Sequence, residues 1–532
     1  MSRPRAEAQA RRPGGDEISR RELLSSALAA SGVAGAFALG LGVGGCGAGT
    51  SAGAVSGGRA GIGSTLVRTW VDPDGTGHLR VGPGEKLVER TDLGPAAAAG
   101  RELARLVHLS DAHVMDAASP ARVPFLARLG PPVQSTFRPQ ETLTAQVLDA
   151  MLGPVRAVAP DLVLQGGDLI DNAQHNELTR ALTLLGGGRV DPSSGPAGYV
   201  GVQLASDPDP FYYRPDIDAP RHPGMLAAAW RPFFARGLGS IPWLPVLGDH
   251  DVLVAGELVP SAQTRALAVG DRALWELPAH LRLPDGFRLN PSASPDGPPD
   301  PRFVADFLAQ ALAGPTVRVP ADPARAELEL AGVVGALRRA ARVDPDAAPV
   351  GERLDLVRDI GDGVRVIVLD LARRDGGSGG LVVPGQGAFL SAALAGAGRR
   401  WVLVVSHQPL EGAAGGTALL AQLDRHPRML AALAGHIHRN RITPRRTSAG
   451  GYWLITTASL VDFPQQARAL SVRETAGGGV VLETWMLDHA GPGPLSPISR
   501  ELAYIDAQGG RPGRFAGMRT DRNVKLFRAP MV

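Results

Sequence analysis

The stretch PVLGDHDVL, residues 245–253, decides how the rest of the chain is interpreted. An apolar run of strand length stops at Gly248, and three side chains able to bind a metal follow directly: Asp249, His250 and Asp251. A polar turn after a strand is common, so this stretch alone fits a capped loop equally well. The decision depends on whether other apolar runs end in the same way.

Five earlier or later apolar runs of strand length also end in polar residues, so the pattern at 245–253 is not isolated. Segments with helical periodicity separate several of them, for example residues 141–152 and 386–397. Strands that alternate with helices predict a layered α/β fold. Three more runs have no helix between them and predict a meander that closes the domain. The five runs are 104–111, 161–168, 364–371, 401–407 and 429–436, and the meander runs are 451–460, 468–474 and 480–487.

Carboxylates and imidazoles follow five of the predicted strands. Open α/β sheets gather their ligands at the carboxyl ends of strands, so these side chains are expected to lie close together. Both side-chain types bind divalent transition metals, and they leave Mn, Fe and Zn equally open. The candidate ligands are Asp111, His113, Asp168, Asp249, His407, His436 and His438.

The spacing within this set adds detail. In DAH (111–113) and HIH (436–438) one residue separates the two candidates, so on extended backbone both point to one side and can converge on one ion. A centre with two ions needs a shared ligand, and because a carboxylate can bridge where an imidazole cannot, Asp168 is the natural bridge. Each motif alone is weak, since a lone buried histidine is more often a hydrogen-bonded core residue. Five such motifs in this order, each at the end of a predicted strand, are hard to obtain by chance.

The ordered motifs resemble those of the calcineurin-like metallophosphoesterase superfamily: Asp-x-His, Gly-Asp-x-x-Asp/Asn, Gly-Asn-His-Asp/Glu, a lone His, and Gly-His-x-His. The resemblance covers about residues 105–489. The stretches GDLIDNAQHNEL (167–178) and ITTASLVDFPQQAR (455–468) look like an exported bacterial subfamily of the actinobacterial twin-arginine type. The resemblance implies a four-layer α-β-β-α sandwich, in which two mixed β-sheets are flanked by helices.

The resemblance also implies an enzyme, a dinuclear metal-dependent phosphoric ester hydrolase. A hydroxide that bridges two divalent ions would attack a phosphate mono- or diester. His250 would protonate the leaving group, and Asp251 would fix the tautomer of His250. The roles carried over give Asp111, His113, Asp168 and His438 to one ion, and Asp168, Asp249, His407 and His436 to the other.

Asp249 departs from the family pattern, which has Asn at this position. Its added negative charge would strengthen cation binding and repel a phosphate oxyanion, so turnover could be slower or the preferred metal different. An alternative is therefore an exported metal-binding or scaffold protein with the same fold and little turnover. His250 argues against this alternative, because such a protein has no reason to keep an additional imidazole there.

The first 45 residues have the features of an export signal. Arg20 and Arg21 precede a weakly apolar, Ala/Gly-rich stretch that ends at Val43, as in twin-arginine signals. A transmembrane anchor is the alternative, since the stretch is nearly long enough to span a membrane. Cys46 is the only cysteine and resembles the lipidated residue of a lipoprotein signal. We therefore expect the twin-arginine machinery as a partner and an extracytoplasmic protein anchored to the cell membrane by lipid.

The remaining chain divides by composition and pattern. Residues 46–100 are expected to be a tether with a short β segment, and residues 101–490 the metallophosphoesterase domain. Insertions near 186–230 and 252–353 have the length of lids or substrate walls, or else of disordered segments. Residues 491–532 are expected to be a C-terminal extension.

The charge gives no indication of a nucleic-acid partner. The chain carries a formal +3, of which the first 45 residues contribute +2 through six Arg and four acidic residues, leaving +1 for the rest. Nor does a Lys/Arg run interleaved with aromatic residues occur in the sequence. The expected partner is a phosphate-ester substrate whose leaving group the sequence does not specify.

Overall fold

The computed structural model describes residues 17–19, 61–129, 134–195, 198–276, 280–282, 301–343, 352–508 and 515–530. Arg20, Arg21 and Cys46 lie outside these residues, as do nearly all of the expected signal (residues 1–45) and residues 46–60 of the expected tether. Within the first 60 residues only the strand β1 (Glu17–Ser19) is described, and it pairs with β11 (His280–Arg282).

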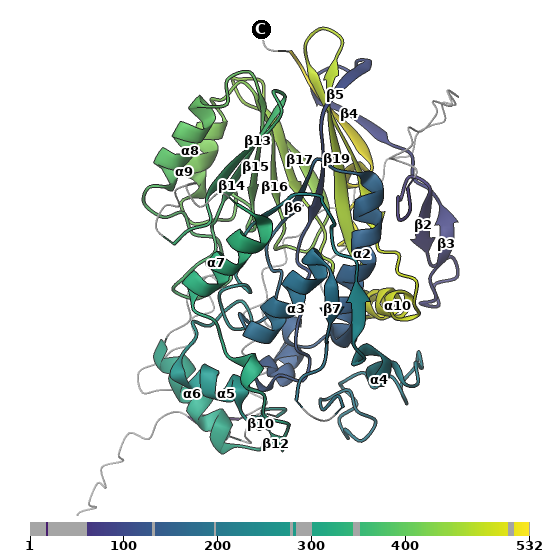
Figure 1. Cartoon of the computed structure of the whole chain (residues 1–532), viewed down its shortest axis with the longest axis vertical. Helices are drawn as coiled ribbons and strands as arrows, with labels where there is room; N and C mark the ends of the chain where they lie inside the picture. The colour runs from purple at the N-terminus through teal and green to yellow at the C-terminus, as the bar shows by residue number, and fades with distance from the viewer. Residues whose placement is uncertain are drawn as a thin grey trace, which may run out of the picture.

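Two mixed β-sheets form the body of the molecule (Figure 1). Seven strands in the order β4-β21-β20-β19-β5-β6-β9 make one sheet, and six in the order β13-β14-β15-β16-β18-β17 make the other. The first contains β4 (Val88–Leu93), β5 (Ala99–Leu109), β6 (Leu162–Gln165), β9 (Trp243–Pro245), β19 (Gln466–Thr475), β20 (Val480–Asp488) and β21 (Val524–Arg528). The second contains β13 (Leu356–Ile360), β14 (Val364–Leu369), β15 (Trp401–Ser406), β16 (Met429–Ala434), β17 (Arg441–Arg445) and β18 (Tyr452–Thr456).

Each sheet contains a run of parallel strands. β5, β6 and β9 are parallel to one another, and so are β14, β15, β16 and β18. β6, β9, β15 and β16 consist mostly of apolar residues and are buried along their whole length, as expected for parallel strands covered on both faces, whereas the first residues of β5 are exposed. The runs predicted from the sequence as strands therefore form the centres of both sheets.

Alternation along β14 and β15 shows how the layers form. Val366, Val368 and Leu403 face the core between the two sheets, whereas Ile367 and Val404 face the opposite side. That opposite side is covered by α8 (Gln386–Ala395) and α9 (Gly416–Leu423). The outer side of the seven-stranded sheet is covered by α2 (Thr144–Val158), α3 (His175–Gly186), α7 (Leu330–Ala341) and α10 (Leu495–Gln508).

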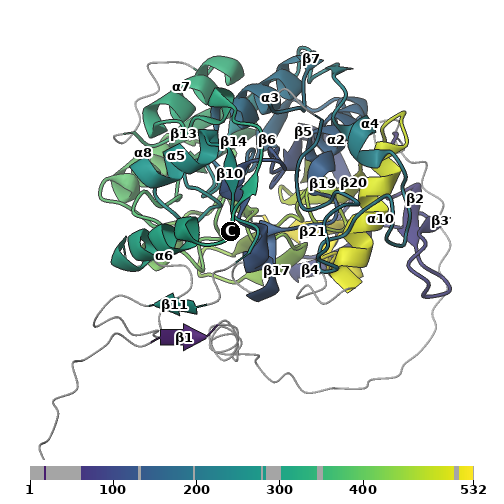
Figure 2. The same ribbon diagram turned by 90° about the horizontal axis from the view of Figure 1, so that it is seen from below.

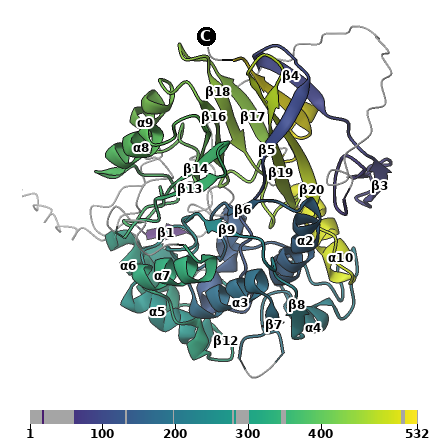
Figure 3. The same cartoon turned by 45° about the horizontal axis from the view of Figure 1, so that its top comes forward.

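Helices therefore lie outside both sheets, with α8 and α9 on one side and α2 and α10 on the other (Figure 3). This arrangement confirms the predicted four-layer α-β-β-α sandwich of two mixed β-sheets.

The predicted limits of the domain, residues 101–490, are too narrow. β4 precedes these limits and β21 follows them, yet the two strands pair with each other in the seven-stranded sheet. The hairpin of β2 (Arg68–Val71) and β3 (Arg80–Pro83) lies beside α10 (Figure 2), where the Arg500 guanidinium covers the Trp70 ring.

The two predicted insertions contain ordered elements among the described residues. The first holds β7 (Gly188–Val190), which pairs with β8 (Phe233–Ala235), and α4 (Met225–Ala229). The second holds α5 (Ala262–Val269), β10 (Arg272–Ala273), α6 (Pro301–Ala313), β12 (Val317–Arg318) and α7. Since α7 contributes Val333 and Leu337 to the main core, the later part of this range belongs to the domain itself.

Candidate metal centre

All seven residues predicted as ligands come together where the parallel strands of both sheets end. Six of them form two groups of three, and within each group one nitrogen or oxygen atom per residue lies within 4.8 Å of the others. Asp168 belongs to two further groups of this kind, with Asp111 and His407 and with Asp249 and His250, and another such group among the described residues joins His113 to Asp171 and His250. We call Asp111, His113 and His438 the first group, and Asp249, His407 and His436 the second group.

Asp168 lies between the two groups. Its Oδ2 is 3.6 Å from Nε2 of His113 in the first group and 3.1 Å from Nε2 of His407 in the second. Its Oδ1 accepts a hydrogen bond of 2.9 Å from the main-chain N–H of His250. One carboxylate oxygen thus faces both groups, which is the position that a shared ligand requires.

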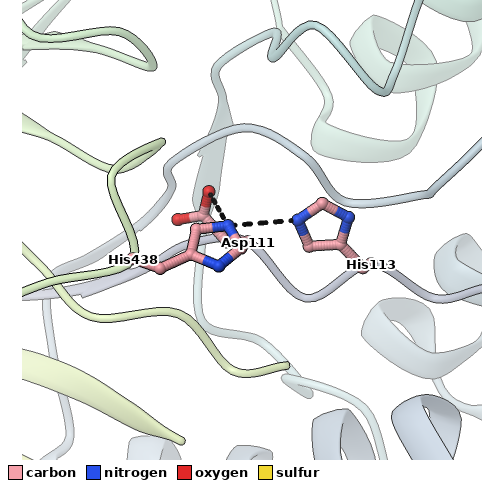
Figure 4. A group of neighbouring side chains, drawn as sticks. All are labelled: Asp111, His113 and His438. Carbon is pink, nitrogen blue, oxygen red and sulfur yellow. Dashed lines mark hydrogen bonds and ion pairs between the residues drawn. The ribbon is translucent and has the colours of Figure 1, made fainter. Parts of the chain in front are cut away.

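The first group joins residues that are 325 positions apart in the sequence, His113 and His438 (Figure 4). Nε2 of His438 is 3.3 Å from Oδ1 of Asp111 and 3.4 Å from Nε2 of His113. The pair in DAH thus belongs to one group. The pair in HIH does not, because His436 lies in the second group. Its two imidazoles are thus divided between the groups, as in the assignment carried over from the resemblance, and do not converge on one ion as their spacing alone would allow.

Carboxylates orient both imidazoles of the first group. Nδ1 of His113 donates to Oδ1 of Asp171 at 2.9 Å, and Nδ1 of His438 donates to Oδ2 of Asp462 at 2.6 Å. Each ring therefore carries a proton at Nδ1, and Nε2 is the atom that faces the centre, where it offers a lone pair when the ring is neutral. Neither acid was a predicted site residue. Asp171 had a signal, as the last acid of the Gly-Asp-x-x-Asp motif, whereas Asp462 stands in no motif of defined spacing.

The second group is held differently. Nδ1 of His407 donates to the main-chain carbonyl of Gly166 at 2.8 Å, and its Nε2 is 3.2 Å from Oδ1 of Asp249. Nδ1 of His436 is 3.3 Å from the same oxygen. Gln408 donates its side-chain amide to this oxygen at 2.9 Å, so Asp249 is the point at which the second group converges.

The donor set fits metal ions. Within the described part of the chain, Nε2 of His407 and Oδ2 of Asp111 are buried without a hydrogen-bond partner. In a neutral His407 ring with its proton at Nδ1, the lone pair of Nε2 would face the oxygens of Asp168 and Asp249, which is repulsive unless a metal ion or a second ring proton lies between them. Ligands about 2.0–2.2 Å from one ion are roughly 3–3.6 Å apart, which matches the 3.1–3.6 Å separations from Asp168.

Charge reinforces this preference for a cation. Although burial by itself would raise the pKa of the Asp111 carboxyl, the imidazoles of His438 and His407 hold it below its usual range. Burial would lower the pKa of His438, but the carboxylates of Asp111 and Asp462 raise it to about 9. The Asp111 carboxylate is thus stabilised by neighbouring positive charge, which a bound cation would also supply.

The convergence expected from the DAH and HIH spacing assumed an extended backbone at the strand ends. The backbone there is not extended. Asp111, His113, Asp168, His436 and His438 have φ values of 55°, 42°, 48°, 65° and 53°. Left-handed turns therefore aim the side chains. Such conformations cost free energy in residues other than glycine and concentrate at functional sites.

Two glycines allow the loops to approach this closely. A Cβ atom at Gly248 would lie 2.0 Å from Oδ1 of Asp168, and one at Gly435 would lie 2.0 Å from Oγ of Ser110 and 2.6 Å from Oδ2 of Asp111. The glycine that ends the apolar run in the opening stretch thus makes room for the carboxylate shared by the two groups.

His250 lies at the rim of the centre, with Nε2 3.9 Å from Oδ2 of Asp249. Its Nδ1 donates to the main-chain carbonyl of Asp171 at 2.8 Å. The prediction that Asp251 fixes the tautomer of His250 is wrong, because both oxygens of Asp251 accept main-chain N–H groups instead. Those donors are Gly248, Leu169 and Ile170, at 2.9, 2.9 and 3.1 Å.

No family model and no curated protein matches the chain. Among solved structures, a dimetal phosphatase from Danio rerio is similar with a TM-score of 0.36 and 14% sequence identity, over 73% of this chain and 100% of that chain. The sulfate thiohydrolase SoxB of Thermus thermophilus, in complex with glycerol, is similar with a TM-score of 0.28 and 14% identity, over 78% of this chain and 62% of that chain. Both scores are low, so the architecture described above rests on the strands and helices of this chain alone.

Proposed function

We propose that the protein hydrolyses phosphate mono- or diesters and uses two divalent transition-metal ions, Mn, Fe or Zn, as cofactors. The observation that carries this proposal is the pair of ligand groups with the Asp168 carboxylate between them. Two ions bound there would lower the pKa of a water molecule and neutralise charge on the phosphoryl group. The first group with Asp168 would hold one ion, and the second group with Asp168 the other.

His250 is the residue suited to donate a proton to the leaving oxygen. Because its Nδ1 is engaged by the carbonyl of Asp171, Nε2 is the atom that can exchange a proton with substrate. Burial alone would lower the pKa of His250, but the Asp168 and Asp171 carboxylates raise it to about 10 where no cation offsets their charge. An acid therefore stands beside the second group, 3.9 Å from Asp249.

Asp249 distinguishes this centre from the pattern that it resembles. A carboxylate in place of the amide adds negative charge near the position of the phosphoryl group. The Gln408 amide, which donates to Oδ1 of Asp249, offsets part of that charge. The side-chain contacts are thus compatible with turnover as well as with tight cation binding.

Activity measurements on metal-reconstituted protein test this proposal. Purified protein would be stripped with a chelator, reloaded with Mn(II), Fe(II) or Zn(II), analysed for metal content and assayed with aryl phosphate and bis-aryl phosphate. We expect close to two ions per chain and hydrolysis that depends on them. Two bound ions without turnover on any ester would favour the metal-binding or scaffold alternative, and failure to bind metal would exclude both.

We further propose that the protein is exported by the twin-arginine route and anchored by lipid at Cys46. The support is the sequence alone, with Arg20 and Arg21 before the apolar stretch and Cys46 directly after it. In the part of the chain that the structure describes, the helices all lack the length and apolarity needed to cross a bilayer.

A further inference from the structure

Two buried arginines lie behind the first group. They are Arg122, at the end of the short 3-10 helix η1 (Pro120–Arg122), and Arg138, two residues after the 3-10 helix η3 (Gln134–Thr136). The side chains of Arg122 and Arg138 are 5% and 1% exposed. Arginines buried this deeply need hydrogen-bond or ion-pair partners. Here the partners are carboxylates that also contact histidines of the first group.

Arg122 leads to His113. Its Nη1 donates to Oδ2 of Asp171, and the other oxygen of that carboxylate accepts from Nδ1 of His113 at 2.9 Å. The side chain of Asp171 is 1% exposed, so water does not screen this pair. One carboxylate is thus held from behind by a guanidinium and in turn holds an imidazole.

Arg138 leads in the same way to His438. Its Nε donates to Oδ1 of Asp462 at 3.0 Å, and Oδ2 of Asp462 accepts from Nδ1 of His438 at 2.6 Å. The Glu141 carboxylate joins the two arms, because its Oε2 accepts from Nη2 of Arg122 at 2.6 Å and from the main-chain N–H of Arg138 at 3.1 Å.

The second group lacks this support among the described residues. His407 is held through the neutral main-chain carbonyl of Gly166, and His436 directs Nδ1 at Asp249, itself a candidate ligand. The two groups therefore differ in a specific way. Both imidazoles of the first group are oriented before an ion arrives, whereas the second group has one ring oriented by a neutral partner and one that faces another ligand.

We propose that Arg122 and Arg138 are positioning residues that preform the first group, so that it binds its ion first and more tightly than the second group does. This inference rests on the proposed two-metal function. A guanidinium neutralises each supporting carboxylate, so the imidazoles are fixed without further negative charge on the centre. An oriented ligand loses less conformational freedom when it binds, and partners behind the ligands typically change metal affinity about 10–100-fold.

Stepwise metal binding tests this proposal. Chelator-stripped full-length protein would be titrated with Mn(II) by calorimetry, with metal analysis at one and two equivalents. We expect two separated affinities in the unmodified protein, with the tighter event lost in His438→Ala and the weaker event lost in His436→Ala. Arg138→Met and Asp462→Asn should each weaken the tighter event about 10–100-fold and leave the weaker event within about twofold.

A matched pair supplies the control. Arg325 and Asp116 form a salt bridge of 2.7 Å between side chains that are both 0% exposed, and Arg325 also donates to Ser194. Arg325→Met and Asp116→Asn should lower thermal stability and leave both Mn(II) affinities within about twofold. If Arg138→Met fails to fold, Asp462→Asn decides, since it keeps the side-chain volume and leaves an oxygen for His438.

Several results would overturn the proposal. These are equal affinities for both ions in the unmodified protein, unchanged affinities in Asp462→Asn, and equal weakening of both events, which would assign the arginines a general structural role. A protein that binds two ions and hydrolyses esters but gives one of these results leaves the proposed function intact. A protein that binds no Mn(II), Fe(II) or Zn(II) overturns both.

Discussion

Asp171 contacts two histidines through different atoms: its main-chain carbonyl accepts from Nδ1 of His250 at 2.8 Å, and its carboxylate accepts from Nδ1 of His113 at 2.9 Å. Nδ1 of His250 also lies 3.4 Å from Oδ1 of the Asp171 carboxylate, so the acid beside His250 is Asp171 and not Asp251. One residue thus fixes both the proposed proton donor and a candidate ligand. This relationship separates the role of His250 from that of Asp251.

His250→Ala should preserve metal content and reduce hydrolysis most for esters with poor leaving groups, by about 10²–10⁴-fold. Activated aryl esters, whose leaving groups need no proton, should lose much less. The measurement is kcat across a series of aryl phosphates of increasing leaving-group pKa. Equal losses across the series would make His250 a positioning residue. Asp251→Asn, which changes only acceptors of main-chain N–H groups, should show no dependence on the leaving group.

Asp168→Ala should lose both ions, because it removes the oxygen that faces His113 and His407 at 3.6 and 3.1 Å. Metal analysis of the purified variant measures this directly. Circular dichroism should show a folded chain, since Asp168 lies at a strand end and outside the apolar core. Full metal content in the folded variant would contradict the shared-ligand assignment.

The sequence predicted the fold and the clustering of the candidate ligands because both depend on local patterns. Apolar runs of four to eight residues marked β6 and β15, and the polar residues after such runs marked Asp168 and His407. β4 escaped prediction since its sequence, VERTDL, is half charged and lies at the edge of its sheet.

The supporting residues could not be predicted in this way. Arg138 and Asp462 are 324 positions apart, and no periodicity connects a side chain to a partner at that distance. The left-handed backbone of His113 and His436 was equally hidden, because only a few per cent of residues other than glycine have positive φ and the enrichment of histidine among them is too weak to predict it. Tertiary contacts impose these conformations, and favourable contacts elsewhere in the fold offset their free-energy cost.

The export proposal predicts two separable effects. Replacing Arg20 and Arg21 together by Lys should leave the precursor in the cytoplasm, because the twin-arginine route recognises the paired guanidinium groups. Cys46→Ser should release the exported protein from the membrane fraction. Cell fractionation and immunoblotting measure both effects. A Cys46→Ser protein that is cleaved but stays with the membrane would contradict the lipid anchor.

Glu327 should make stability depend on pH. Burial raises its pKa from 4.5 to about 7, although Thr264 donates to its carboxylate at 3.0 Å. The folded state then binds the proton more tightly than the unfolded state, so the stabilisation present below pH 4.5 is lost as pH rises towards 7. Glu327→Gln should match the unmodified protein at pH 4.5 and exceed its free energy of unfolding by about 1–2 kcal/mol at pH 8, allowing for partial exposure. Urea denaturation at both pH values measures this, and an equal difference at the two would refute it.

Asp249→Asn tests the residue with which the opening stretch departs from the pattern it resembles. The amide oxygen can still face His407 and His436, and it can still accept from Gln408, so the second group keeps its geometry. With one negative charge fewer, the second ion should bind more weakly while the first keeps its affinity, because Asp249 does not belong to the first group. At saturating metal, turnover should be unchanged or higher, since the substrate oxyanion is repelled less. Metal titration and kcat at saturating Mn(II) separate the two effects. A collapse of kcat with both ions bound would mean that the reaction itself depends on the carboxylate, beyond its contribution to cation binding.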